Sequence, residues 1–268
     1  MPHPTFRRLV AMVVLALTAA SVHAQSPYSC DASACTLPDC HCASTQAPGG
    51  LTVADTPQFV VITFDDCITE RTEQVTRPLF EDLRNPDGTP ALATYFLSLE
   101  RCPGDGGISD PDLVAKRAQY GDEVGVHTVT HTTSAHTHRA EWRREITGVV
   151  DYLNTLGVQS DGLGFRAPYV QTNQSLFDEL HEQDFLYDAS VYEPPFWSRV
   201  STGWGNYVWP HTLDFGHGNH CNWAWNTKCT VKSLPGLWSF PLYYHVDPDR
   251  SDPYVGAFDV GHPPYSGG

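Results

Sequence analysis

Two adjacent carboxylates, Asp65 and Asp66, end an apolar run of β-branched and aromatic residues that begins at Phe59. Such a run is typical of a strand covered on both faces, as in a parallel sheet packed between helices. Burying two neighbouring carboxylates is costly unless a cation or a positioned proton pairs with them, which favours a metal or proton-transfer site. In the alternative interpretation, the two residues simply open the next turn.

Further polar groups stand at the ends of later predicted strands. His127 and His131 end the third strand, Arg166 and Tyr169 end the fourth, and Asp188 lies near the end of the fifth. The carboxyl ends of successive parallel strands meet at one edge of a curved or closed sheet, so these groups are expected to come together. The β-branched residues between the two histidines favour a strand-to-turn geometry over a helical face.

Two neutral imidazoles and one carboxylate make a three-ligand metal site that leaves positions for water and substrate. A divalent ion there lowers the pKa of a bound water and polarises a carbonyl oxygen. The second carboxylate of the pair could then accept the water's proton, with Arg166 orienting it. The same ligand types occur in non-haem iron oxygenases, but the ligand order and the intervening helices fit that class poorly. The groups therefore predict a hydrolase that splits an amide or an ester.

Strands and helices alternate along the chain with a repeat close to that of a β-α-β unit, which predicts an α/β fold with a parallel sheet or barrel. The helix near residue 110 opens with Asp110 as its cap and Pro111 in its first turn. The predicted strands are 59–64, 92–97, 123–127, 162–166 and 185–190, and the other predicted helices are 73–84, 139–156 and 174–183.

The alternation ends after Ser190, where a segment rich in tryptophan, glycine and asparagine covers residues 192–238. Exposed aromatic rings stack on the apolar faces of sugars, so Trp197, Trp204 and Trp209 are candidate carbohydrate-binding residues. In the alternative, several of these rings fill a small disulfide-closed core.

The amino-terminal residues 1–24 read as a secretory signal peptide, with an apolar run too short for a membrane span. All eight cysteines follow it, which fits disulfides in a secreted, extracellular protein. Residues 25–58 are expected to form a Cys-rich cap. A formal net charge of −15 makes nucleic acid a poor partner. Oligomeric state cannot be read from these patterns.

Three sequence motifs resemble the first three motifs of polysaccharide deacetylases of the NodB-homology type. They are Thr63-Phe64-Asp65-Asp66, the segment from His127 to His131, and Arg166-Ala167-Pro168-Tyr169. Flanking phrases such as Leu37-Pro38-Asp39-Cys40 and Trp209-Pro210 are similar to the secreted, chitin deacetylase-like branch. The resemblance covers about residues 30 to 245.

The resemblance implies a distorted (β/α) barrel over residues 59–268 and metal-dependent removal of N-acetyl groups from chitin or chitooligosaccharides. Zn²⁺ is the expected ion, with Co²⁺ as a possible substitute. The implied roles are catalytic base for Asp65, metal ligands for Asp66, His127 and His131, positioning of the base for Arg166, oxyanion contact for Tyr169, fourth-motif counterpart for Asp188, and hydrophobic wall as a second possibility for Trp209.

The sequence departs from the family pattern in three respects. Cys67 follows the carboxylate pair in place of a small residue, as a disulfide partner or an extra soft ligand. The family's fifth motif, a Leu-x-His that supplies the general acid, has no match, because Leu242 and His245 have the wrong spacing. About five strands are predicted before Ser190, fewer than a barrel needs. We therefore expect a barrel that is incomplete at its C-terminus, from a truncated gene or a natural short form.

These departures keep a second function open, that of a catalytically weak or inactive deacetylase-like protein that binds carbohydrate in a matrix. Peptidoglycan and xylan remain alternative substrates, because the same site would serve them.

Overall fold

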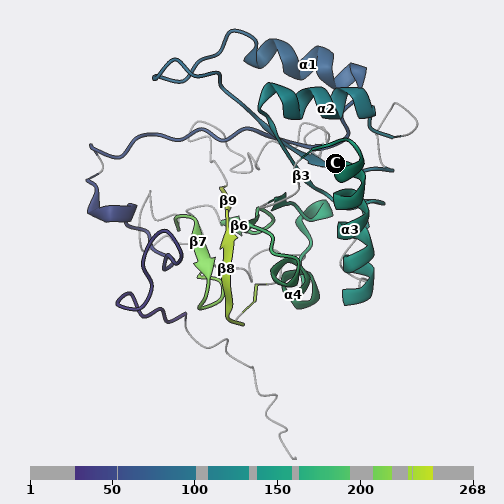
Figure 1. Ribbon diagram of the computed structural model, residues 1–268. Coiled ribbons are helices and arrows are strands. Elements are labelled where there is room, and N and C mark those ends of the chain that lie inside the picture. The colour runs from purple at the N-terminus through teal and green to yellow at the C-terminus, as the bar shows by residue number, and fades with distance from the viewer. Residues whose placement is uncertain are drawn as a thin grey trace, which may run out of the picture.

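The computed structural model (Figure 1) describes residues 28–52, 54–100, 108–132, 138–158, 163–193, 208–218, 229–230 and 232–243. Its centre is a seven-stranded sheet with the order β1-β2-β3-β4-β5-β8-β7. All neighbouring pairs are parallel except β7 with β8. The predicted α/β fold with a mostly parallel sheet is confirmed. The strands are β1 (Thr63–Asp66), β2 (Thr94–Leu97), β3 (Glu123–Val126), β4 (Gly164–Phe165), β5 (Tyr187–Asp188), β7 (His211–Leu213) and β8 (Leu234–Ser239), and β6 (Tyr192–Glu193) pairs with β9 (Leu242–Tyr243) in a separate small sheet.

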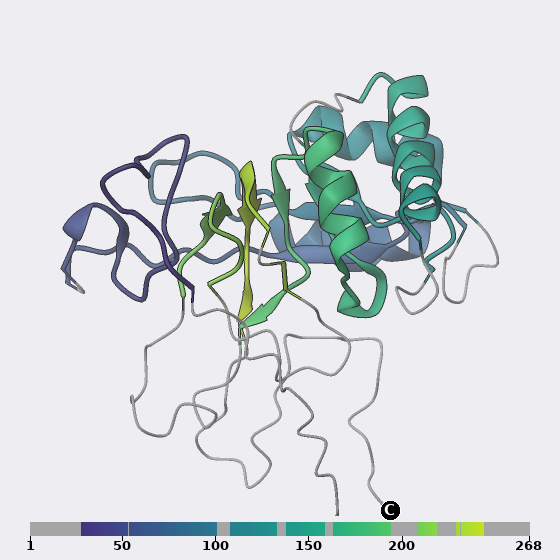
Figure 2. The ribbon, with the colours of Figure 1, turned by 90° about the horizontal axis from the view of Figure 1, so that it is seen from below.

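Four α-helices accompany these strands in the part of the chain that the structure describes, and two short 3-10 turns lie at Pro48–Gly50 and Pro168–Val170. None of the described helices is long and apolar enough to span a bilayer. In Figure 2 the helices gather at one end of the molecule and the amino-terminal segment lies at the other. The helices are α1 (Glu70–Phe80), α2 (Pro111–Tyr120), α3 (Arg139–Thr155) and α4 (Gln174–Glu182).

The boundaries of α2 follow from its end residues. Asp110 accepts hydrogen bonds from the backbone N–H groups of Asp112 and Leu113, which satisfies two donors of the first turn. Pro111 needs no donor in the first turn, and the helix stops at Gly121, whose φ of 107° lies in the left-handed region. The predicted start at Asp110 and Pro111 is confirmed.

The core lies between the sheet and the helices that pack on it, and α3 contributes one buried face. The sequence predicts an apolar face on this helix made of Trp142, Ile146, Val149, Val150 and Leu153; four of these residues are completely buried, and Val150 is half-buried. Phe165 of β4 packs edge-on against Trp142. This contact fixes α3 over the central strands, where it can reach the carboxyl edge of the sheet.

The first strand differs from its prediction. The strand begins at Thr63 and contains both carboxylates, whereas the apolar residues before it are exposed, with 71% exposure at Phe59 and 75% at Val60. β1 is the edge of the described sheet, so it has β2 as its neighbour on one side and none on the other. The expectation that residues 59–64 form a strand covered on both faces is therefore wrong for the chain as described.

Strands β7 and β8 lie in the segment where the sequence predicts no alternation. β8 contains Pro235 and Gly236, and Gly236 has a φ of 81°. The pairing of β7 with β8 shifts register between Thr212 and Leu213. A proline, a left-handed glycine and a register shift remove the regular two-residue period from which a strand is recognised.

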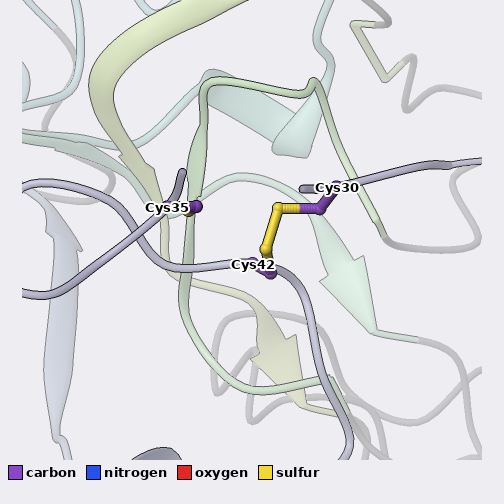
Figure 3. Close-up of side chains that lie close together, drawn as sticks. All are labelled: Cys30, Cys35 and Cys42. Carbon is purple, nitrogen blue, oxygen red and sulfur yellow. A yellow bond between two sulfur atoms is a disulfide. The ribbon is translucent and has the colours of Figure 1, made fainter. Parts of the chain in front are cut away.

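The amino-terminal cap is tied by disulfides between Cys30 and Cys42 and between Cys35 and Cys40. Figure 3 shows the first of these with the side chain of Cys35 close by. His41 joins the cap to the sheet, because its carbonyl accepts a hydrogen bond from Thr212 N–H (3.0 Å) and its own N–H donates to Thr212 Oγ1 (3.1 Å). The expected Cys-rich, disulfide-tied cap is confirmed, and it is anchored on β7.

Two buried histidines lie behind this junction. His211 and His217 have ring centroids 6.3 Å apart, and each accepts a backbone hydrogen bond, from Gly218 N–H at 3.2 Å and from Thr230 N–H at 3.1 Å, respectively. Burial lowers the pKa of His211 to about 4 and that of His217 to about 3. Both rings are therefore neutral in the folded protein over the ordinary pH range.

We expect the neutral histidines to make the fold sensitive to acid. An unfolded histidine titrates near pH 6.5, so the unfolded chain binds more protons than the folded chain between about pH 6.5 and pH 4. The free energy of unfolding should therefore fall as pH drops through this window, by at most about 1.4 kcal/mol per pH unit for each histidine. Urea unfolding at several pH values measures this slope.

A matched variant separates the histidines from other groups. The buried carboxyl of Asp188, whose pKa is raised to about 6 by burial, titrates in part of the same window with the opposite sign. The informative quantity is therefore the difference between wild type and His211→Gln. A wild-type slope that stays unchanged in this variant would contradict the assignment to His211.

Candidate active site

The predicted site residues lie at the carboxyl edge of the parallel sheet. Asp65 and Asp66 end β1, His127 follows β3 directly, Arg166 follows β4, and Asp188 ends β5. The register pairs Asp66 with Leu97 and Val126 with Phe165, so the ends of these strands stay level across the sheet. This alignment brings residues far apart in sequence to one edge.

Asp66, His127 and His131 form one cluster of potential metal ligands. Their ligand atoms all lie within 4.8 Å of one another. Asp66 Oδ1 is 3.6 Å from His127 Nε2 and 3.3 Å from His131 Nε2. One carboxylate oxygen and two imidazole nitrogens converging in this way match the donor set of a three-ligand divalent-metal site. The structure thus brings together the three ligands that the sequence predicts.

The orientation of His127 is set by its second ring nitrogen. His127 Nδ1–H donates to the carbonyl oxygen of Arg166 at 2.7 Å. This bond fixes the tautomer in which Nε2 keeps its lone pair, and it turns Nε2 towards Asp66. A histidine held in this way is prepared to bind a cation without rotation.

Asp65 faces Arg166 rather than the ligand cluster. Arg166 Nη1 lies 3.3 Å from both carboxylate oxygens of Asp65, and Arg166 Nη2 donates to Thr63 Oγ1 at 3.3 Å. Arg166 is buried, whereas the side chain of Asp65 is 36% exposed. The guanidinium orients the carboxylate at an accessible position, which suits a proton acceptor.

The aromatic ring of Phe96, in β2, packs against the guanidinium of Arg166. The guanidinium carbon lies 4.6 Å from the centre of the Phe96 ring, and this ring is fully buried. A cation on the face of a buried aromatic ring is stabilised and loses rotational freedom. This contact was not predicted, because Phe96 has the pattern of an ordinary apolar strand residue.

Asp188 is completely buried and does not belong to the ligand cluster. It accepts hydrogen bonds from the hydroxyl (2.6 Å) and the backbone N–H (3.1 Å) of Ser190, and the same hydroxyl accepts Ala167 N–H at 2.7 Å. Desolvation raises the pKa of Asp188 to about 6, against the lowering effect of Ser190 and of the charge on Arg166. Asp188 thus braces the turn that follows Arg166, and Ser190 is a linking residue that the sequence did not reveal.

The backbone around the site is unusual. Asp66, Thr128, His131, Tyr169 and Val170 all have φ between 50° and 80°, in the left-handed region. Residues other than glycine seldom adopt this conformation, and it concentrates at functional sites. Tyr169 lies beside the ligand cluster, because its ring centre is 4.6 Å from that of His131.

Of the three predicted sugar-binding tryptophans, Trp209 is described by the structure, whereas Trp197 and Trp204 lie outside the described residues. β7 starts two residues after Trp209, and its first residue, His211, pairs with Ser239, which in turn pairs with Asp188. This register places half-buried Trp209 at the same edge of the sheet as the ligand cluster. The backbone N–H of Trp209 donates a hydrogen bond to the carbonyl oxygen of Ser44 in the cap, at 2.9 Å.

The cysteines near these groups are not available to a metal. Cys67 is disulfide-bonded, which decides between the two roles that the sequence left open for it. Cys30, Cys35 and Cys42 form the second group with metal-ligand spacing in the described part of the chain, but all three are in disulfides. His245, weighed as an acid, lies outside the described residues.

The part of the sequence that carries these residues matches a known protein family. The family model described as polysaccharide deacetylase matches residues 52–187, which is half of the chain. The chain belongs to the polysaccharide deacetylase family. The matched range contains the carboxylate pair, both histidines and Arg166.

Two relatives from Bombyx mori carry the name chitin deacetylase. The chain is 30% identical to chitin deacetylase 8 over 245 residues, covering 88% of the chain and 60% of the relative. It is 31% identical to chitin deacetylase 1 over 203 residues, covering 72% and 35%. A solved family 4 carbohydrate esterase from Streptomyces lividans, in complex with acetate, is 23% identical with a TM-score of 0.39, over 49% of this chain and 61% of that one. The chain thus spans less than two thirds of the length of each of these three proteins.

Proposed function

We propose that this polysaccharide deacetylase is a secreted, zinc-dependent N-deacetylase of chitin or chitooligosaccharides. The observation that carries the proposal is the cluster of Asp66, His127 and His131 beside an exposed carboxylate, Asp65, that a buried arginine holds. The 30% identity to chitin deacetylase 8 supports the choice of substrate. The predicted signal peptide and the disulfides support the location outside the cell.

Asp66, His127 and His131 would hold the ion. Two imidazole nitrogens and a carboxylate oxygen suit zinc, and cobalt accepts the same donors. Zinc bound there supplies a Lewis acid for an acetyl carbonyl and lowers the pKa of a water molecule.

The chain's own residues account for the proton transfer. In amide hydrolysis, a water oxygen adds to the acetyl carbonyl carbon, one proton of that water passes to the amide nitrogen, and the C–N bond breaks to give a free amine and acetic acid, which ionises to acetate. Asp65 accepts the proton of the attacking water, since its carboxylate is accessible and is oriented by Arg166. Phe96 and the Asp188–Ser190 pair keep Arg166 and its turn in place. The backbone N–H of Tyr169 is our candidate donor to the developing oxyanion.

Trp209 is the candidate residue for the sugar ring, since the register of β7 with β8 puts it at the same end of the sheet as the carboxyl ends of the parallel strands. Trp197 and Trp204 remain predictions from the sequence. Aromatic side chains of this kind bind the apolar face of a pyranose ring.

The test is acetate release from N-acetylchitooligosaccharides. We expect wild-type protein to release acetate, a chelator of divalent ions to abolish the release, and added Zn²⁺ to restore it, because the ion held by the ligand cluster would be the Lewis acid that polarises the acetyl carbonyl. Acetate is measured by a coupled enzymatic assay, and the deacetylated sugar by mass spectrometry.

Two outcomes would contradict the proposal. Acetate release that persists in the presence of a chelator would show that the reaction does not depend on the metal. Release from acetylated xylan but not from chitin oligomers would show that the substrate is xylan rather than chitin. His127→Ala serves as the matched control, since it removes one ligand and should reproduce the effect of chelation without a chelator present.

A second candidate is a deacetylase-like protein that binds carbohydrate with little or no turnover. The observation that favours it is the lack of a Leu-x-His motif in the 268 residues. Retention on chitin beads together with zinc binding, but without acetate release, would support this function over the first.

A further inference from the structure

The loop from His127 to His131 holds two residues in the left-handed region of the backbone. Thr128 has a φ of 73° and His131 a φ of 54°. This region is unfavourable for an L-residue, so such a loop keeps its shape where surrounding contacts enforce it. The position of His131 relative to Asp66 therefore depends on what holds residues 128–130.

Glu145 of α3 makes three hydrogen bonds to this loop. Its Oε2 accepts Thr130 N–H at 2.8 Å, its Oε1 accepts the Thr130 hydroxyl at 2.9 Å, and its backbone carbonyl accepts Val129 N–H at 3.1 Å. All three donors lie between His127 and His131. Three hydrogen bonds to one residue therefore attach the loop to α3.

Packing holds the same loop from two sides. A Cβ atom on Gly148 would lie 2.5 Å from Val129 Cγ2, so the absence of a side chain there lets α3 approach the loop closely. On the other side, the carbonyl of Val129 accepts Glu100 N–H at 2.8 Å. The loop is thus clasped between α3 and the segment that follows β2.

From these contacts we infer that Glu145 is a positioning residue for the metal centre, which acts by fixing the loop that carries His131. It is not a member of the ligand cluster. The inference rests on the proposed function in one respect, namely that the cluster binds a divalent ion. Its effect should be seen in ion affinity, whether or not acetate is released.

The experiment compares Zn²⁺ affinity in four proteins by competition with a chromophoric chelator. We expect Glu145→Ala to weaken binding by about 10- to 100-fold, the range found when the outer support of a ligating histidine is removed. Glu145→Gln should stay close to wild type, because its amide oxygen can accept Thr130 N–H while its NH₂ donates to the hydroxyl. Asp151→Ala, an exposed change on the same helix, should have no effect.

A second variant and a second readout guard against a general folding defect. Thr130→Val removes one of the three bonds and should give a smaller loss, which keeps the inference testable if Glu145→Ala does not fold. Adding Zn²⁺ should raise the Tm of Glu145→Ala by less than it raises the Tm of wild type. This difference should be larger than the difference in Tm between the two zinc-free proteins.

Two results would overturn the inference. One is an affinity in folded Glu145→Ala within twofold of wild type. The other is an equal loss in Glu145→Ala and Glu145→Gln, which would indicate the charge of Glu145 rather than its hydrogen bonds. A wild-type protein that binds zinc without releasing acetate would contradict the proposed function and leave this inference standing.

Discussion

Asp65→Asn is expected to lower the rate of acetate release by about 10²- to 10⁴-fold while Zn²⁺ still binds, because a general base commonly contributes that factor. Asparagine keeps the shape of the side chain but cannot accept the proton of the attacking water. Asp65 faces Arg166 and is not among the clustered ligands, so the ion should be held as before. Acetate release and zinc titration on the same sample measure the two effects separately.

Asp66→Asn is the matched control for this prediction, because it alters the adjacent residue, whose Oδ1 faces both histidines. It should weaken zinc binding, in contrast to Asp65→Asn. If the Asp65 variant lost zinc, or kept more than about a tenth of the wild-type rate, the assignment of Asp65 as base would be wrong.

Arg117→Met is expected to cost about 3–5 kcal/mol of folding free energy, the range observed when one partner of a buried ion pair is removed. The Arg117 guanidinium of α2 donates to both carboxylate oxygens of Glu73 and, at 3.2 Å, to Asp122. All three side chains are almost fully buried. Asp122 also accepts Ala93 N–H, so the group joins α1, α2 and the approach to β2. Urea unfolding measures the loss.

Two companion variants test whether the cost comes from uncompensated charge. Adding Glu73→Gln and Asp122→Asn to Arg117→Met should recover a large part of the lost stability, since no buried carboxylate is then left unpaired. Lys116→Met, an exposed change next to Arg117, should stay within about 0.5 kcal/mol of wild type. A similar loss from both single methionine variants would refute this account.

The ligand cluster was predictable because it depends on a few local facts. Asp66 ends β1 and His127 directly follows β3, and parallel strands bring their carboxyl ends to one edge whatever the rest of the sheet does. His131 follows His127 by four residues in the same loop. The ends of α2 were predictable for a similar reason, since a cap residue, a proline and a glycine act within one turn.

The exposed residues at the start of β1 show where this reasoning fails. An apolar run indicates that a strand could be covered on both faces, but whether a neighbour lies beside it is decided by the order of strands in the sheet. β1 lies at the edge of the described sheet, and Phe59 and Val60 stay exposed.

The supporting residues of the site were hidden for another reason. Each of these residues contacts another segment of the chain. Phe96 packs on Arg166, and Glu145 binds the loop before His131. Ser190 donates to Asp188 and accepts from Ala167. An apolar strand residue, a helix glutamate and a serine carry no local signal for such roles. Their contribution appears only when the backbone has placed the partners together.

The left-handed backbone at the candidate site also bears on how freely the sequence can vary elsewhere. Five residues there, Asp66, Thr128, His131, Tyr169 and Val170, each hold a conformation that costs roughly 1 kcal/mol, against a net stability of about 5–15 kcal/mol for a typical domain. The buried face of α3 therefore stabilises the strained backbone of the candidate site as well as the fold. A substitution that shortens a core side chain, such as Val149→Ala, lowers the same free energy of unfolding that these strained residues already lower. The number of substitutions that this protein tolerates is therefore limited by distant strained turns as much as by local packing.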